Sequence, residues 1–229
     1  MDTNLTYRAK LNDPYSSHSH IIAFAGAGNG QRLLDVGSAQ GALAEQFQAA
    51  GFEVTCIEAD PEWAELARPK CHQLIVADLD GPLPQLPGLY DVIVYGDVLE
   101  HLKNPRAVFT GLNQALRPGG RIIVSIPNIV HLFVRLNVLV GRFEYMDRGI
   151  LDRTHLRFFT LASFRRFLHE AGLQIEQLAV TPVPLPLIVP LRYHGRCLRA
   201  IHWLNAACAR IWKTMFGYQF VVVARRRTG

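Results

Sequence analysis

Carboxylates and glycines follow short apolar runs at several places in this chain, in a pattern that could bind a nucleotide-like ligand. The stretch "LLDVGSAQG" places Asp35 just before Gly37 and Gly41, and later apolar runs end at Glu58 and Asp78. Glycines allow a tight turn and let backbone N–H groups approach a ligand closely. Carboxylates can accept hydrogen bonds from hydroxyl and ammonium groups. We therefore expect a ligand site built from these segments.

The identity of the ligand can be narrowed from the residues around the turn. Glu58 lies 17 residues beyond Gly41, and an acidic side chain about 20 residues past such a turn commonly binds ribose hydroxyls. The dinucleotide pattern G-x-G-x-x-G/A requires glycine where this chain has Ala39. Asp35 would repel a pyrophosphate and suits an ammonium group, although it could also merely cap the following helix. These features favour S-adenosylmethionine, which has an ammonium, a ribose and no phosphate, over NAD.

Alternating strand and helix patterns would hold these residues in place. Strand patterns cover residues 32–37, 52–59, 72–78, 90–97, 121–128, 173–180 and 218–226, and helix patterns cover 42–51, 60–69, 104–120 and 160–172. Asp60, Asn104 and Thr160 stand at expected helix N-caps. Residues 121–141 read as a strand running into a helix. This alternation predicts an α/β fold with a doubly wound, mostly parallel sheet that is covered on both faces.

Five motifs in the same order resemble those of class I S-adenosylmethionine-dependent methyltransferases. They are "LLDVGSAQG", "CIEAD", "VADLD", "YDVIVYGDVLEHL" and "LRPGGRIIVSIPN", and together they cover about residues 32–128. The resemblance implies a Rossmann-like, seven-stranded sheet whose final strand is antiparallel, and "FGYQFVVVARR" suits that strand. It also implies that S-adenosyl-L-methionine is the cofactor.

The resemblance assigns expected roles to ten residues around the cofactor. Asp35, Gly37, Ser38 and Gly41 would hold the methionine end, Glu58 and Ala59 the ribose, Asp78 and Leu79 the adenine, and Gly96 and Asp97 the floor near the sulfonium. One departure is Ala39, where the family often has glycine. Its methyl group should be tolerated if the backbone there keeps an ordinary φ angle.

Two histidines are candidate catalytic bases. His101 lies in "GDVLEHL", and His155 lies in "GRFEYMDRGILDRTHLRFFT". The latter segment resembles the acceptor side of bacterial methyltransferases that act on small molecules, quinones and sugars. An imidazole has an ordinary pKa that suits proton transfer near neutral pH. Each histidine could instead have a structural role, His101 in orienting a loop and His155 in bonding to the backbone.

Other polar residues of this segment are weaker candidates. Tyr145 and Arg153 are less suited to the role of base. Asp147 and Asp152 could bind a metal, but no clustered set of carboxylates and histidines accompanies them in the sequence. We therefore expect no metal.

The C-terminal quarter of the chain is basic. The last acidic residue is Glu176, and eight arginines and lysines follow it. Residues 193–217 contain an apolar seam at helical spacing, formed by Ile201, Leu204, Cys208, Ile211 and Met215. This seam could pack into the core, or the helix could lie on an anionic membrane through the basic segment 192–213. Nucleic acid is a less favoured partner, because no motif for it is present and the rest of the chain is acidic.

The sequence has no signal-peptide pattern, no apolar run long enough to span a bilayer, and no paired cysteine motif. We expect reduced thiols and a cytoplasmic location, with peripheral contact at the inner membrane face.

The expected organisation is one methyltransferase domain over residues 1–229. It comprises a cofactor-binding core at 30–128, an acceptor-side insert at 129–172, and a proline-broken extended segment with a basic amphipathic helix at 182–217. The expected reaction is O-methylation of a small-molecule or lipid-linked acceptor, such as a quinone precursor or a glycan sugar. N- or C-methylation and a non-catalytic cofactor-binding module that docks a partner enzyme are the alternatives.

Overall fold

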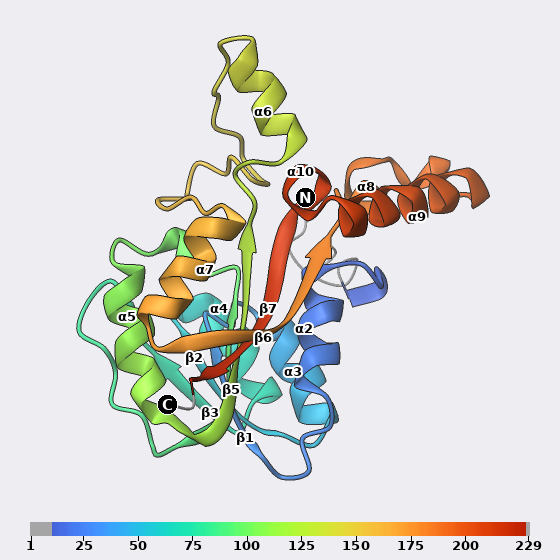
Figure 1. Cartoon of the computed structure of the whole chain (residues 1–229). Helices are drawn as coiled ribbons and strands as arrows, with labels where there is room; N and C mark the ends of the chain where they lie inside the picture. The colour runs from blue at the N-terminus through green and yellow to red at the C-terminus, as the bar shows by residue number, and fades with distance from the viewer. Residues whose placement is uncertain (1–10, 228–229) are drawn as a thin grey trace.

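The computed structural model describes residues 11–227 and contains one seven-stranded sheet (Figure 1). The strands are β1 (Arg32–Val36), β2 (Glu53–Glu58), β3 (Gln73–Val76), β4 (Tyr90–Gly96), β5 (Leu116–Pro127), β6 (Leu173–Thr181) and β7 (Gln219–Arg226). Their order is β3-β2-β1-β4-β5-β7-β6, and β7 runs antiparallel to both neighbours while the other pairs are parallel. The expected doubly wound, Rossmann-like sheet with an antiparallel final strand is confirmed. The domain boundaries stay a prediction, and residues 1–10 and 228–229 lie outside the described part.

Helices cover both faces of the sheet, as the alternating pattern predicted. On one face, α2 (Ser17–Ala25) and α3 (Ala42–Ala49) bury Ile21 and Phe47 against β1, β2 and β4. On the other face, α5 (Pro105–Leu112) and α7 (Leu161–Glu170) bury Phe109 and Phe164 in a larger apolar cluster. The short helix α4 (Pro61–Ala67) packs beside β2 and β3. Apolar side chains thus pack on both faces of β1 and β4. This packing holds the two central strands, and with them their carboxyl ends, in place.

Local capping fixes where the helices begin. Asp60 accepts hydrogen bonds from the N–H groups of Glu62 and Trp63, and Asn104 accepts one from Ala107. Thr160 and Ser163 form a reciprocal capping box at the start of α7. All three predicted caps are confirmed, because each side-chain oxygen satisfies an N–H group that the helix itself leaves unpaired.

Three expectations about secondary structure were wrong or incomplete. The helix predicted to reach residue 120 ends at Leu112, because Leu116 already pairs with Tyr90 as β5 begins. The segment expected to be extended contains the short helix α8 (Leu185–Ile188), since proline is tolerated in the first turn of a helix. Helix α2 was not expected at all. Its N-cap, Ser16, accepts a hydrogen bond from the N–H of Ser19.

Two segments project from the end of the sheet where the parallel strands finish (Figure 1). The first holds α6 (Leu132–Leu139), just after β5, so the predicted strand-to-helix run is confirmed. The second holds α8, α9 (Arg196–Ile211) and α10 (Lys213–Phe216), between β6 and β7. No helix among residues 11–227 is both long and apolar enough to cross a membrane.

Helix α9 is held to the body by buried polar contacts rather than by its apolar seam. The ring of His202, 6% exposed, lies 3.1 Å through Nε2 from a carboxylate oxygen of Asp13 and meets the edge of Tyr15. Ile201 and Leu204 are each 57% exposed. The interpretation of this seam as core packing is therefore wrong, because His202, Ala206 and Ala209 form the buried face instead.

Candidate active site

The turn after β1 is tied to the end of β2. The N–H groups of Gly37 and Ser38 both donate to the carbonyl of Ile57, at 2.9 and 3.0 Å. The next N–H, that of Ala39, donates to Oε2 of Glu58 at 2.7 Å. Three successive N–H groups are thus already bonded within the protein. A turn of this kind therefore offers few donors to a pyrophosphate.

The conformation of the turn explains its glycines. Gly37 has φ of +68°, and a Cβ there would lie 2.7 Å from a methyl of Val98. Gly41 has φ of +75°, and a Cβ there would lie 3.0 Å from the Cα of Ala67. Ala39 has φ of +47°. The condition set for it, an ordinary φ angle, is therefore not fulfilled, and the alanine occupies a left-handed conformation that glycine adopts more easily.

Asp35 leaves a carboxylate oxygen for a ligand. The residue is 2% exposed, and its Oδ2 atom is buried without a hydrogen-bond partner among the described residues. Burial, reinforced by the nearby Cys71 and Glu58, raises the pKa of Asp35 to about 8. A buried carboxyl lacking a partner is costly. A cationic ligand group placed there would satisfy it, which fits the ammonium end of S-adenosylmethionine.

Glu58 closes the next part of the predicted cofactor site. Its carboxylate accepts hydrogen bonds from the N–H groups of Ala39, Ala59 and Asp60, at 2.7, 2.9 and 3.0 Å. Oε2 carries one of these bonds and Oε1 carries two. Because each carboxylate oxygen can accept about two hydrogen bonds, Oε2 keeps capacity for a ribose hydroxyl. The side chain is therefore held rigidly in the place where the sequence pattern put it.

The remaining predicted cofactor residues lie after β3 and β4, at the same edge of the sheet. Asp78 is exposed and accepts a hydrogen bond from the N–H of Asp80, while Leu79 is 7% exposed. Gly96 ends β4, and Asp97 follows with φ of +56°. The N–H of Asp97 donates to the hydroxyl of Ser125, which the sequence reasoning did not single out. The carboxyl ends of the neighbouring parallel strands thus bring all ten predicted residues to one edge.

The two candidate bases meet each other. The rings of His101 and His155 have centroids 4.8 Å apart in an edge-to-face arrangement, although 54 residues separate them in the chain. His155 is 8% exposed and its Nδ1 lies 3.0 Å from the carbonyl of Ile150. A carbonyl only accepts, so this bond places the proton of neutral His155 on Nδ1 and leaves Nε2 as an acceptor.

The surroundings of His101 favour its neutral form. Its Nδ1 lies 3.1 Å from the hydroxyl and 3.3 Å from the carbonyl of Thr154. Burial, and then the charge that His155 can carry, lower the pKa of His101 below its ordinary value. A neutral imidazole can accept a proton at physiological pH. The backbone carbonyl of Glu100, next to His101, accepts hydrogen bonds from the N–H groups of Leu156 and Arg157. These bonds hold the segment that carries His155 beside His101.

Glu100 joins the two histidines in one cluster. Its side chain is 1% exposed, and one ligand-type atom from each of Glu100, His101 and His155 lies within 4.8 Å of the others. A carboxylate with two imidazoles is a donor set that divalent cations accept. The sequence reasoning missed this cluster, because His155 comes from the distant insert and Glu100, next to His101, was given no role.

The other weak candidates are not members of this cluster. Tyr145 is 51% exposed and packs edge-on against Phe143. Arg153 forms an exposed ion pair with Asp147 at 2.5 Å. Asp152 accepts hydrogen bonds from the N–H and hydroxyl of Thr154 and so supports the residue that contacts His101.

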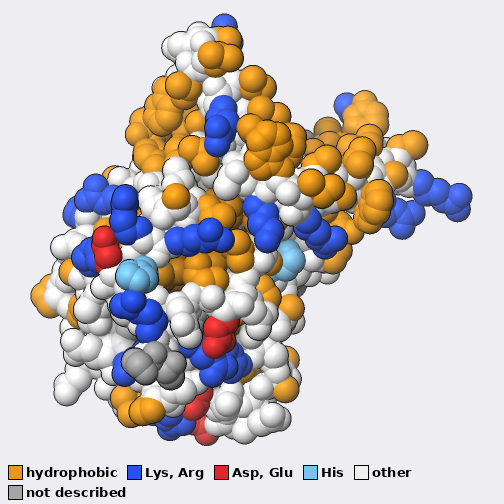
Figure 2. Space-filling model, viewed as in Figure 1, with side chains coloured by type: hydrophobic (Ala, Val, Ile, Leu, Met, Phe, Trp, Pro, Cys, Tyr) orange, Lys and Arg blue, Asp and Glu red, His pale blue; other side chains and the backbone are white. Residues whose placement is uncertain are grey.

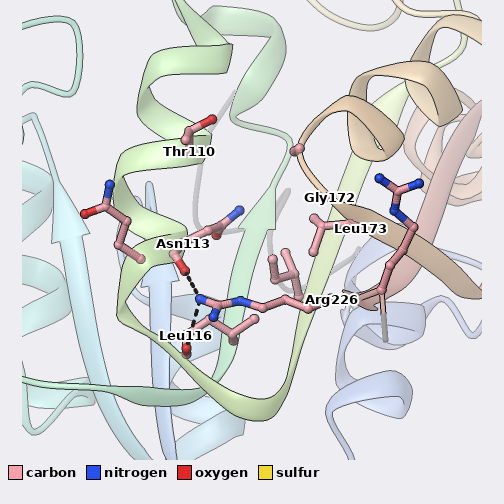
Figure 3. Close-up of a pocket in the computed structure, with 10 residues that line it drawn as sticks. Thr110, Asn113, Leu116, Gly172, Leu173 and Arg226 are labelled. Atoms are coloured by element: carbon pink, nitrogen blue, oxygen red, sulfur yellow. Dashed lines mark hydrogen bonds between the residues drawn. The ribbon is translucent and has the colours of Figure 1, made fainter. Parts of the chain in front are cut away.

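A cavity of about 350 Å³ at the opposite edge of the sheet is not part of this site (Figure 3). Arg226 crosses it and donates to the backbone carbonyls of Asn113 and Leu116, at 2.9 and 3.2 Å. Leu116 begins β5 and Leu173 begins β6. The cavity therefore lies where the parallel strands start, whereas ligands of open α/β sheets bind where they end.

Comparison with known proteins places the chain in a family. Residues 7–178 match a family model described as a methyltransferase domain. Over 160 residues the chain is 32% identical to the ubiquinone biosynthesis O-methyltransferase of Xanthomonas euvesicatoria pv. vesicatoria, a match that covers 66% of this chain and 65% of that protein. It is 33% identical over 161 residues to the protein of the same name from Xylella fastidiosa, covering 66% and 64%. The matched stretch is thus less than two thirds of either relative.

Solved structures share the fold at low sequence identity. The magnesium protoporphyrin IX methyltransferase of Synechocystis PCC 6803 with bound S-adenosylhomocysteine aligns with a TM-score of 0.64 at 17% identity, over 99% of this chain and 90% of that one. An S-adenosylmethionine-dependent methyltransferase from Archaeoglobus fulgidus aligns with a TM-score of 0.61 at 17% identity, over 98% and 100%. With the family match over most of its length, the chain belongs to the class I S-adenosylmethionine-dependent methyltransferases.

Proposed function

We propose that this protein transfers the methyl group of S-adenosylmethionine to a hydroxyl oxygen of a small-molecule or lipid-linked acceptor, such as a quinone precursor or a glycan sugar. The observation that carries this proposal is the contact between His101 and His155 beside the end of β4. The names of the curated relatives support a quinone-type acceptor in particular.

The geometry of the predicted cofactor residues fits S-adenosylmethionine. The free oxygen of Asp35 would accept the ammonium group, Oε2 of Glu58 a ribose hydroxyl, and Leu79 would pack against the adenine. When bound, the cofactor supplies a methyl group already activated on a sulfonium. The protein's own task is to position the acceptor in line with that methyl and to exclude water.

Methylation of a hydroxyl also requires removal of its proton. The acceptor oxygen forms the new bond to the methyl carbon as the bond between sulfur and carbon breaks, which leaves S-adenosylhomocysteine. In our proposal Nε2 of His101 takes the hydroxyl proton, because the pKa of His101 is lowered and the ring is neutral at physiological pH. His155 lies against it and orients the ring.

We also propose that residues 192–213 touch an anionic membrane surface and bring the enzyme to its acceptor. Arg192, Arg196, Arg199, Arg210 and Lys213 lie in this segment, which has no acidic residue. Trp203 and Trp212 are exposed on it, as are Ile201, Leu204 and Ile211. Exposed apolar and aromatic side chains beside cations are typical of helices that lie in the membrane interface.

The function can be tested with the purified chain and S-adenosylmethionine. A panel of water-soluble dihydroxybenzenes, free sugars and an extracted lipid fraction would be offered as acceptors, and formation of S-adenosylhomocysteine would be followed. We expect product with a hydroxylated aromatic acceptor. Cofactor binding without product from any acceptor would contradict the proposal and favour a non-catalytic module. Product formed only on amines would move the reaction to N-methylation.

A further inference from the structure

The first of two apolar projections is the α6 arm, residues 132–143. It leaves the body directly after β5 and stands clear of the rest of the protein (Figure 1). Leu139 is 81% exposed and Val140 is 67% exposed, and Phe133, Leu136 and Val138 are about half exposed. At about 100° per residue these side chains surround most of the helix. Only Val134 in this helix is buried. Such an arm exposes a continuous apolar surface to water, and exposed apolar surfaces of this kind mark sites of interaction.

The second projection is the α9 arm, residues 185–212. Leu191 is 83% exposed and Ile211 is 86% exposed. Trp203 and Trp212 lie on the same arm with 59% and 54% of their surface in solvent. The five cations of the 192–213 segment lie on it or immediately after it, without a single acidic residue among them.

Both arms extend from the edge of the sheet that holds the candidate active site. The α6 arm follows the carboxyl end of β5, and the α9 arm follows the end of β6, while the cofactor residues follow β1 to β4 at the same edge. Figure 2 shows apolar side chains over both projections, with arginine and lysine side chains lying between and below them. The two apolar surfaces thus project from one side of the molecule.

We propose that the α6 arm is a second membrane-inserting element, and that both arms together seat the enzyme on an anionic lipid bilayer with its active site toward the lipid. This inference builds on the proposed membrane contact of residues 192–213 and assigns a partner to a different part of the chain. Three properties favour a bilayer over a protein partner.

The first property is the distribution of apolar residues around α6. A protein partner usually buries one face of a helix, whereas lipid can surround a projecting tip on several sides. The second is charge. Arg142 lies just after the α6 tip and Arg135 lies in the first half of α6, while every charged residue of the α9 arm is basic, so both arms suit anionic head groups. The third concerns the α9 arm, where Tyr193, Trp203 and Trp212 are exposed, because tryptophan and tyrosine favour the boundary between lipid and water.

A groove on the α6 arm adds to this picture. A cavity of about 440 Å³ is lined by Ile129, Val130, Val134, Arg135, Val138, Leu139 and Phe143. Six of these seven side chains are apolar. The groove lies between the arm and the chain that leaves β5, so a hydrocarbon chain of a lipid could enter it from the bilayer without crossing water.

The proposal can be tested by co-sedimentation of the full chain with vesicles of phosphatidylcholine alone or with phosphatidylglycerol. The α6 variant is Leu139→Glu with Val140→Glu, and the α9 variant is Arg196→Glu with Arg199→Glu. The matched control is Leu66→Glu with Leu89→Glu, because these leucines are 48% and 45% exposed elsewhere on the surface. Thermal unfolding and S-adenosylmethionine binding would confirm that each variant is folded.

We expect the wild type and the control to bind phosphatidylglycerol vesicles at low salt, and both arm variants to bind at least tenfold more weakly. In a background where Trp203 and Trp212 are replaced with phenylalanine, a Leu139→Trp variant should give blue-shifted fluorescence that brominated lipid quenches. If the α6 variant binds as the wild type does, insertion of α6 is refuted, while contact through residues 192–213 survives. If the wild type binds no vesicles, both membrane proposals fail, and turnover of a soluble acceptor still decides the enzymatic one.

Two other occupants would overturn the proposal in distinct ways. Self-association in analytical ultracentrifugation that the α6 variant abolishes, without vesicle binding by the wild type, would make the surface an interface between two copies of the chain. Tight binding of a single-stranded oligonucleotide that competes with vesicles would assign the basic arm to nucleic acid instead.

Discussion

The backbone N–H of Ala39 donates a 2.7 Å hydrogen bond to Oε2 of Glu58, and so joins the turn after β1 to the end of β2. The bond holds Ala39 in a left-handed conformation that an alanine adopts only at a cost. One contact therefore positions Glu58, the residue predicted to bind the ribose, and strains the turn beside the methionine end of the site.

Replacing Ala39 with glycine should relieve this strain. Glycine adopts φ of +47° without the steric penalty, although its unfolded chain gains entropy. We expect the free energy of unfolding to rise by up to about 1 kcal/mol, which corresponds to about 2–4 °C in the melting temperature of a chain this long. Thermal unfolding would measure it. Ala49→Gly is the control, since Ala49 is helical and exposed and its replacement should destabilise. Equal destabilisation by both variants would contradict the strain.

The raised pKa of Asp35 should make stability depend on pH. Because burial raises this pKa from the ordinary 3.8 to about 8, the folded chain keeps a proton that the unfolded chain releases. The stabilisation is complete below pH 4 and is lost as the pH rises toward 8. Burial lowers the pKa of His20, His101 and His131, which acts in the opposite direction around pH 6.5. The effect of Asp35 is therefore read from the difference between the wild type and Asp35→Asn, whose stability should fall less between pH 5 and 8.

The same carboxyl should couple cofactor binding to pH. If ionised Asp35 accepts the ammonium of S-adenosylmethionine, affinity should increase close to tenfold per pH unit below 8, and Asp35→Asn should remove that dependence. Calorimetric titration at pH 6, 7 and 8 would measure it. An unchanged dependence in the variant would show that another group binds the ammonium.

The histidine pair should separate a base from a positioning residue. His101→Ala should lower kcat by about 10²–10⁴ if His101 is the base, with little change in cofactor affinity. His155→Ala should have a smaller effect and should shift the acidic limb of the pH profile, because His155 lowers the pKa of His101. His169→Ala, on the distant end of α7, is the control. Full activity of His101→Ala would exclude it as the base.

Chelation distinguishes this base from a metal site. Glu100, His101 and His155 lie close enough to suggest ligands for a cation, yet we predict that turnover is independent of metal. The rate should be unchanged after treatment with EDTA. A loss that magnesium or zinc restores, together with a matching loss in Glu100→Gln, would assign the cluster to a cation.

The pair formed by His202 and Asp13 should anchor α9 to the body. Both side chains are buried, and His202→Ala would remove the imidazole from the carboxylate of Asp13, which would keep its hydrogen bond from the N–H of Tyr15. We expect a loss of about 1–3 kcal/mol in stability and faster hydrogen exchange in α9 than in the central strands. Asp13→Ala combined with His202→Ala should cost less than the sum of the single changes. Additive losses would indicate that the pair is not coupled.

The central part of the fold could be predicted because its signals are local. The apolar run of residues 32–36 predicts strand β1. Asp60 and Thr160 predict where helices start, because their side chains accept hydrogen bonds from nearby N–H groups. The ends of adjacent parallel strands then collect Asp35 and Glu58 without any knowledge of loops. These features depend on neighbours within a few residues or on one rule of sheet topology.

The remaining features depend on contacts that no local pattern contains. The burial of His202 against Asp13 reverses which face of α9 is inside, so its apolar seam was wrongly expected in the core. The contact between His101 and His155 joins two loops, which the carbonyl of Glu100 and the contacts of His101 with Thr154 hold together across the sequence. The left-handed Ala39 follows from Glu58 rather than from its own preference.

The place of β7 has a consequence for how the chain acquires its structure. β7 lies between β5 and β6 and is the only strand neighbour of β6 in the described sheet. While the chain is being synthesised, β1 to β5 can assemble, but β6 has no partner until residues 219–226 have left the ribosome. Until then β5 keeps an open edge, and both apolar arms are already exposed. The nascent chain is therefore most prone to aggregation in the interval between completing β6 and completing β7.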